Sequence, residues 1–202
     1  MTKLSALFAL FLVGLSVPAH AQDFTIDSAH SSANWTVTHL MVSKVRGEIS
    51  GVTGKVHYDA KNVGDTTVEA TLDAATVDSH QPKRNDHLKS PDFFDVVKFP
   101  TITFKSTHVE SAGEGKLKVT GDLTMRGVTK SVVLSVDGPS APHSDGYGHN
   151  KVGATATTTI NRQDFGVSWN KTLDSGGVVV SNEVAVTIDL ELGTDAAGAK
   201  TK

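Results

Sequence analysis

The chain has 202 residues, of which 38% are hydrophobic and 20% charged, and its formal net charge is -3 at pH 7. This length fits one globular domain, and the mild acidity argues against a general nucleic-acid binder, which would carry a basic stripe. The sequence contains no cysteine, so disulfides are excluded, and stability must come from a continuous hydrophobic interior or from a closed sheet.

Residues 1–21 have the pattern of a cleavable secretory signal. Lys3 supplies the positive charge, residues 4–17 form an apolar stretch, and Ala19-His20-Ala21 is a small-x-small cleavage site. The apolar stretch is shorter than the roughly 20 residues that a membrane-spanning helix needs. We therefore expect a mature chain that begins near Gln22, is exported to the periplasm or outside the cell and carries no lipid anchor, since no cysteine follows the signal.

Most of the mature sequence alternates between apolar and polar residues, which is the period of a half-buried β-strand. The alternating segments are residues 33–39, 68–74, 117–125, 152–160 and 184–192. Turn-forming residues separate them at 59–65, 111–115 and 174–177. One apolar face and one polar face predict antiparallel strands with a solvated side.

Helix is scarce, and only residues 40–43 and 82–89 are predicted as helical turns. Gly47, Gly51 and Gly54 lie in a strand-like run, where glycine indicates a bulge or bend that lets a sheet curl. Residues 137–151 contain two prolines and three glycines and are predicted to be a mobile surface loop. Residues 193–202 have almost no apolar surface and are predicted to be a disordered polar tail.

The size of the inward-facing residues favours a barrel over a sandwich. A sandwich of this length would need larger side chains to reach native packing density, whereas a barrel lined by small residues leaves an internal space. The small inward positions are Ala33, Ala70, Ala74, Gly121, Ala154 and Ala156. We predict an all-β, antiparallel, lipocalin-like barrel of about eight strands over residues 22–192, with an apolar internal channel and one or two short helical turns.

Residues 84–107 are the most informative stretch. A charged, helix-permissive turn ends at Ser90-Pro91, because proline biases the preceding residue away from the helical region. Phe93 and Phe94 follow where a soluble loop would be polar, and a short alternating strand closes the segment. Cations beside an apolar cluster at the mouth of a β-structure suit an amphipathic ligand. We interpret the segment as the lid and rim of an apolar tube.

Motifs spread along the chain resemble those of the YceI-like family, exported lipocalin-like proteins that bind polyisoprenoid lipids. They are Ile26-Asp27, His30-Ser31, residues 39–47, residues 84–107, residues 121–129, residues 160–166 and residues 180–184. The resemblance implies an antiparallel barrel around a long apolar channel that takes an isoprenoid chain, and it implies no catalytic residues. It leaves the lipid open among prenyl diphosphates, quinone-like molecules and fatty-acid derivatives. Residues 137–151 and the tail show least of the family pattern.

The tail of such a lipid needs only apolar walls, because burial gains about 25 cal/mol per Å² of apolar surface. The predicted tail-binding residues are Trp35, Val37, Leu72, Phe104, Leu123, Ile160, Val186 and Ile188, with Phe93 and Phe94 closing over the tail or plugging the end of the barrel. The alternative for each position is ordinary hydrophobic core.

A polar head group needs partners where the channel opens, and a guanidinium can hold phosphate oxygens with two parallel hydrogen bonds. The predicted head-group residues are His39, Arg84, His87, Arg126 and Arg162. The alternative roles are structural: residues 84–87 cap the short helix, Arg162 pairs with Asp164 or a neighbour, and His39 bonds a backbone carbonyl.

The sequence thus leads to a periplasmic binding or carrier protein whose ligand is an isoprenoid lipid, either a polyprenyl diphosphate or a quinone-like molecule. No catalytic residue, metal site or cofactor is predicted, since no histidine pair has a recognised ligand spacing. One alternative is an enzyme that acts on the lipid head with His39 or His87 as base. Another is a solid barrel that meets partners at edge strands. A homodimer and transient contact with a membrane or its proteins are further partner hypotheses.

Overall fold

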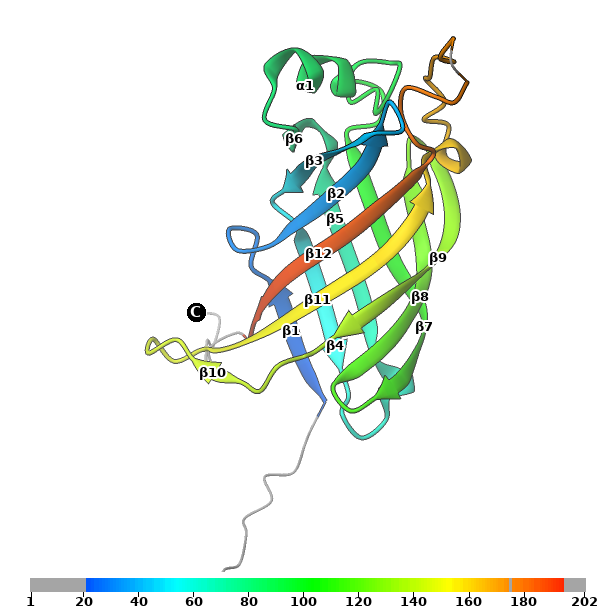
Figure 1. Cartoon of the computed structure of the whole chain (residues 1–202). Helices are drawn as coiled ribbons and strands as arrows, with labels where there is room; N and C mark the ends of the chain where they lie inside the picture. The colour runs from blue at the N-terminus through cyan, green and yellow to red at the C-terminus, as the bar shows by residue number, and fades with distance from the viewer. Residues whose placement is uncertain (1–20, 175, 195–202) are drawn as a thin grey trace, which may run out of the picture.

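A computed structural model describes residues 21–174 and 176–194 of the chain (Figure 1). The predicted signal, except for Ala21, and residues 195–202 of the predicted tail lie outside the described residues, and Gly193 ends the last strand. Within the described part, no helix is long and apolar enough to cross a membrane. The elements are β1 (Gln22–Ile26), β2 (Ser32–His39), β3 (Ser43–Ser50), β4 (Thr53–Tyr58), β5 (Thr67–Asp73), β6 (Val77–Asp78), α1 (Pro82–Lys89), β7 (Thr101–Gly113), β8 (Lys116–Met125), β9 (Val128–Asp137), β10 (His143–Ser144), β11 (Asn150–Asn161) and β12 (Glu183–Gly193), with single 3-10 turns at Val63–Asp65, Ala74–Thr76 and Arg162–Phe165.

The strands form one antiparallel sheet that closes on itself, which confirms the predicted barrel. In the order β11, β9, β8, β7, β5, β4, β1 and β12, each strand is hydrogen-bonded to the next, and the β11–β12 ladder joins the last to the first. This ladder runs from Lys151 opposite Gly193 to Asn161 opposite Glu183. Eight strands therefore close a ring, and closure pairs edges that an open sheet would leave exposed.

Three further strands extend the wall at one end of the barrel. β12 pairs with β1 at Leu192 and Gly193 and with β2 from Ala185 to Asp189. β3 follows β2, and β6 pairs with β3 just before α1. Helix α1 thus lies at this end, together with the long connection between β11 and β12 (Figure 1). We call this the α1 end, formed by residues 40–44, 79–100, 126–127, 162–174 and 176–182.

Alternation along the strands places the apolar side chains inside. In β8, Leu117, Val119 and Met125 are buried, whereas Lys116 and Lys118 are exposed. Toward the β7–β8 turn, a cluster of buried side chains lines the inner wall, and three of its members, Phe104, Leu134 and Ala156, border the cavity described below. The members of the cluster are Phe104, Val109, Leu117, Val119, Leu134 and Ala156.

The predicted helical turn at residues 82–89 is confirmed as α1. The side chain of Gln81 accepts a hydrogen bond from the Arg84 backbone N–H at 2.7 Å, Pro82 occupies the first turn, and the helix ends before Ser90-Pro91. Capping and proline chemistry within a few residues determine both ends, so this helix could be located without its tertiary surroundings.

The predicted helical turn at residues 40–43 is wrong. Leu40 and Met41 have φ angles of 51° and 60°, and the Val42 N–H donates to the His39 carbonyl at 3.0 Å. The segment is therefore a tight left-handed hairpin turn between β2 and β3, a geometry normally built from Asn and Gly. The predicted mobile loop at residues 137–151 also contains local structure, because β10 pairs with the start of β11.

Candidate functional site

The barrel encloses a cavity of about 400 Å³ that extends toward the α1 end. Its wall is almost wholly apolar, because every lining side chain is aliphatic or aromatic except five. These five are His39, Arg84, His87, Thr158 and Arg162. A space of this kind accepts hydrocarbon without any hydrogen bond along its length.

All ten residues predicted for the lipid tail line this one cavity. Alternation along the strands predicted most of them, and it could also have found Ile49, Ile102 and Val132, which share the inward face of their strands. Trp169, Val179 and Val180 line the cavity from the irregular β11–β12 connection. No periodic signal marks them there, so alternation could not assign them to the inner wall.

Two glycines let large rings lie flat against the sheet. A Cβ at Gly47 would overlap the indole of Trp35, its cross-strand partner, and a Cβ at Gly121 would overlap the ring of Phe104. Of the small inward residues, Ala33, Ala70 and Ala156 border the cavity. At Gly121 no space is left for the cavity, because the ring of Phe104 occupies it.

Arg162 brings a buried positive charge to the cavity wall. Its side chain donates to the carbonyl oxygens of Val167 at 2.6 Å and Ser181 at 3.0 Å, and only 4% of the residue is exposed. Burial lowers the pKa of Arg162 below its ordinary value, yet an arginine remains charged in proteins. Among the described residues no carboxylate forms an ion pair with it, and Asp164 is exposed. Of the structural alternative given for Arg162, the pairing with Asp164 is therefore wrong, whereas hydrogen bonds to neighbouring groups are present.

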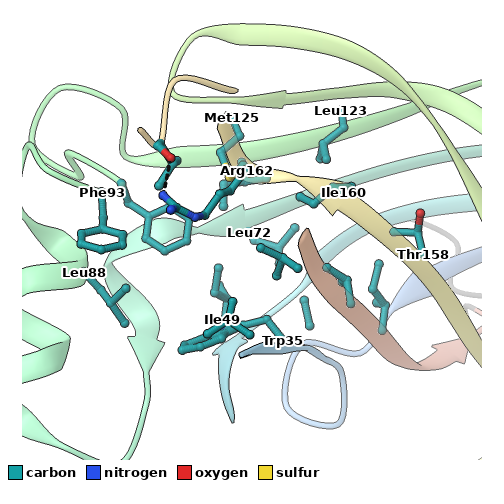
Figure 2. Close-up of a pocket in the computed structure, with 18 of the residues that line it drawn as sticks. Trp35, Ile49, Leu72, Leu88, Phe93, Leu123, Met125, Thr158, Ile160 and Arg162 are labelled. Carbon is teal, nitrogen blue, oxygen red and sulfur yellow. Dashed lines mark hydrogen bonds between the residues drawn. The ribbon is translucent and has the colours of Figure 1, made fainter. Parts of the chain in front are cut away.

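The hydrogen bonds of Arg162 also hold the two ends of the β11–β12 connection together. Figure 2 shows its guanidinium on the same side of the cavity as Phe93 and Leu88, away from Thr158. The charge of Arg162 therefore lies at the α1 end, and the part of the wall away from this end is apolar except for Thr158.

Helix α1 covers the cavity and contributes two of the other polar residues. The Arg84 guanidinium donates to the hydroxyl and carbonyl oxygens of buried Ser79 at 2.8 and 2.7 Å. His87 lies 2.9 Å from the Asp92 carboxylate, and its ring meets those of Phe93 and Trp169 edge-on at 4.9 and 5.0 Å. These contacts fasten the helix to the loops around it.

Arg126 is placed differently from the other predicted head-group residues. It does not line the cavity, and it donates to the backbone carbonyls of Pro91 and Phe93. Arg126 therefore braces the segment after α1 from the β8–β9 turn. His39, in contrast, lines the cavity at the end of β2, where it pairs with Val180.

A separate polar cluster lies outside the cavity, where β1, β11 and β12 meet. Asp27, His30 and Glu191 bring three potential metal ligands within 4.8 Å of one another. However, the Lys151 ammonium lies 2.8 Å from Asp27 and 3.0 Å from Glu191, and it holds the pKa of Asp27 at about 2. A cation is thus already supplied, and the cluster is an ion-pair network that joins β1, β11 and β12.

Comparison with known proteins identifies relatives over most of the chain. The family model described as YceI-like domain matches residues 24–192. A UPF0312 protein of Vibrio parahaemolyticus is 37% identical over 167 residues, which cover 79% of this chain and 88% of that protein. A UPF0312 protein of Vibrio cholerae serotype O1 is 38% identical over 166 residues, or 78% of this chain and 87% of that protein.

Solved structures show the same fold. The YCEI protein of Campylobacter jejuni is 26% identical, with a TM-score of 0.65 over 78% of this chain and 90% of that one. A polyisoprenoid binding domain from Saccharophagus degradans, 15% identical, has a TM-score of 0.60 over 85% of this chain and 98% of its own.

Proposed function

The chain belongs to the YceI-like family, and on that premise we propose that it is a periplasmic binding or carrier protein that holds an isoprenoid lipid inside its barrel. The observation that carries the proposal is the cavity of about 400 Å³ with its apolar wall. A solid barrel that acts only through its edges does not account for this space. The periplasmic location rests on the signal pattern of residues 1–21.

The cavity volume limits how much of a lipid it can hold. An apolar cavity of about 150 Å³ accepts benzene, so on that scale about 400 Å³ holds roughly 15 to 20 carbon atoms. This corresponds to about three or four isoprene units. The remainder of a longer polyprenyl chain would leave the barrel at the α1 end.

The charges at the α1 end favour an anionic head group. Arg162 is buried without an ion-pair partner among the described residues, and His39, Arg84 and His87 line the same cavity. Buried charges in proteins are normally paired, and a phosphate would provide the missing negative charge. We infer that a polyprenyl phosphate or diphosphate fits better than a quinone, whose oxygens are uncharged.

We assign no catalytic role to the histidines that line the cavity. His87 is held by Asp92 and packs edge-on against Phe93 and Trp169, whose rings also contact each other, which suits a structural part of the lid. Turnover of a lipid head group that disappears in His87→Ala, while the lipid still binds, would contradict this assignment.

Extraction of the purified protein with organic solvent, followed by mass spectrometry, tests whether a lipid is bound. Uptake is then measured for farnesyl phosphate, farnesol and a short-chain quinone. We expect farnesyl phosphate to bind most tightly, because a hydrogen bond to a charged group contributes about 1.5–3 kcal/mol. Failure to extract any lipid, together with no uptake of any of the three, would refute the proposal.

Substitution of Arg162 tests the head-group assignment. Arg162→Met should weaken farnesyl phosphate binding roughly tenfold to a hundredfold and leave farnesol unchanged, whereas Arg162→Lys should retain part of the preference. Arg46→Met is the matched control, because Arg46 is exposed on β3 and does not line the cavity. Equal losses for farnesol and farnesyl phosphate would mean that Arg162 only supports the fold.

A further inference from the structure

We propose that the α1 end of the barrel docks on the surface of a bilayer that contains anionic phospholipids. This inference rests on the proposed lipid-carrying function and adds the surface with which the cargo is exchanged. The first observation is the position of exposed apolar side chains. Of the large hydrophobic residues that are exposed in the described chain, four lie at the α1 end, namely Leu40 (42% exposed), Met41 (62%), Val42 (86%) and Val97 (95%), and two lie elsewhere, Val133 and Tyr147.

Three of these four are consecutive at the tip of the β2–β3 hairpin. Leu40 and Met41 both adopt left-handed φ angles, a conformation that non-glycine residues rarely adopt without a compensating role. The β11–β12 connection holds the turn in place, since the Leu40 N–H donates to the Val179 carbonyl at 2.8 Å and His39 forms a β-bridge with Val180. The backbone is therefore tied to the barrel while the apolar side chains face solvent.

Charge is distributed unequally between the two ends of the barrel. The loops of the α1 end carry eight Lys or Arg and five Asp residues, a formal charge of +3, although the whole chain is at -3. The opposite loops, residues 21–23, 59–66, 111–116 and 137–150, carry two Lys and six acidic residues, a formal charge of -4. A negatively charged surface would therefore attract the α1 end and repel the opposite end.

Basic side chains also flank the apolar tip itself. Lys44 follows the hairpin turn, and Lys171 is brought near it because its carbonyl accepts from the Val179 N–H at 3.0 Å. Both residues are exposed. Apolar residues that enter the interface, with lysines beside them, are the combination by which proteins bind anionic membrane surfaces.

The same segments border the cavity at the α1 end. His39, Val179 and Val180 border the cavity, and each lies next to the hairpin tip in sequence or in hydrogen bonding. Docking would thus place this end of the cavity on the bilayer. A second copy of this chain fits less well, since a symmetric dimer through this face would bring two ends of charge +3 together.

Vesicle flotation tests the proposal with the full mature protein. Binding is compared on vesicles of phosphatidylcholine alone and of phosphatidylcholine mixed with phosphatidylglycerol. We expect binding to the anionic vesicles that decreases with salt. Lys44→Gln and Lys171→Gln should each reduce the partition coefficient roughly fivefold, because one basic residue near an anionic surface contributes about that factor. Met41→Ser combined with Val42→Ser should reduce it further.

The matched control variants are substitutions in the loops at the end of the barrel opposite the α1 end. Tyr147→Ser removes a side chain that is 88% exposed, and Lys61→Gln removes an exposed charge; neither should change vesicle binding. Lipid uptake and thermal unfolding are measured for every variant, so that loss of docking is separated from loss of folding or of cargo binding. Vesicle binding that persists without any cargo uptake would refute the proposed function and leave docking standing.

Two results would overturn the docking proposal. The first is equal binding of the wild type and the hairpin variants to both vesicle types. The second is concentration-dependent dimerisation in analytical ultracentrifugation that the hairpin variants abolish, without vesicle binding, which would assign the patch to a second copy of the chain.

Discussion

Replacement of Ala156 by phenylalanine should fill the cavity without unfolding the protein. Ala156 lies on β11, is 3% exposed and borders the cavity, with Ile188 and Val136 as cross-strand neighbours. A benzene-sized ring occupies about 150 Å³, which is more than a third of the cavity of about 400 Å³. The cavity of the variant should therefore hold roughly six fewer carbon atoms of lipid than that of the wild type, since six is the number in benzene.

The stability of Ala156→Phe distinguishes a hollow barrel from a packed one. In a packed interior the larger ring would cost about 1–3 kcal/mol through overpacking. In a hollow one its burial should contribute up to about 2 kcal/mol, since phenylalanine gains about that much on leaving water. We expect the free energy of unfolding, measured by urea denaturation, to remain unchanged or to increase.

Mass spectrometry of lipid uptake measures the second consequence. With prenyl phosphates of graded length, the variant should lose the longest chains that the wild type binds. Thr157→Phe is the control, because Thr157 is exposed on the outer face of the same strand. Destabilisation by more than about 2 kcal/mol, with the range of bound lengths unchanged, would refute the reasoning.

Three other perturbations test separate parts of the fold. Gly47→Ala should displace the Trp35 indole and destabilise the protein by about 1–3 kcal/mol; unchanged tryptophan fluorescence would count against the close packing. Arg126→Ala should release the segment after α1, lower the unfolding free energy by about 1–2 kcal/mol and speed lipid dissociation in stopped-flow measurements. Lys151 lowers the pKa of Asp27 from 3.8 to about 2, so the carboxylate stabilises the fold above pH 4 and loses this contribution as the pH falls toward 2. Lys151→Met should make the melting temperature depend less on pH in this range, and an unaltered pH dependence would contradict the role assigned to Lys151.

Much of the barrel could be predicted because the direction of a side chain in a strand is a local property. Successive residues point to opposite faces, so alternation along β8 and β12 identified the inward set before any pairing was known. The same logic placed Trp35, Leu72 and Ile188 on the inner wall, and all three border the cavity. Likewise, α1 was found from its own capping and proline residues.

The hairpin at residues 40–42 shows where local reasoning fails. Its sequence, Leu-Met-Val, carries none of the usual turn residues, and the left-handed backbone is held by the hydrogen bond from the Leu40 N–H to the carbonyl of the distant Val179. Such a conformation depends on contacts that the chain makes only after the barrel closes.

The sequence by itself determined an antiparallel barrel with an apolar interior, because periodicity and turn chemistry are written in neighbouring residues. Only the tertiary structure decided which polar residues reach that interior. Arg126 and Arg162 both lie at strand ends beside family motifs, yet the first braces the lid from outside and the second enters the cavity wall. The difference arises because each guanidinium turns toward backbone carbonyls of irregular loops, Pro91 and Phe93 for Arg126 and Val167 and Ser181 for Arg162, and the path of the folded loops positions those carbonyls.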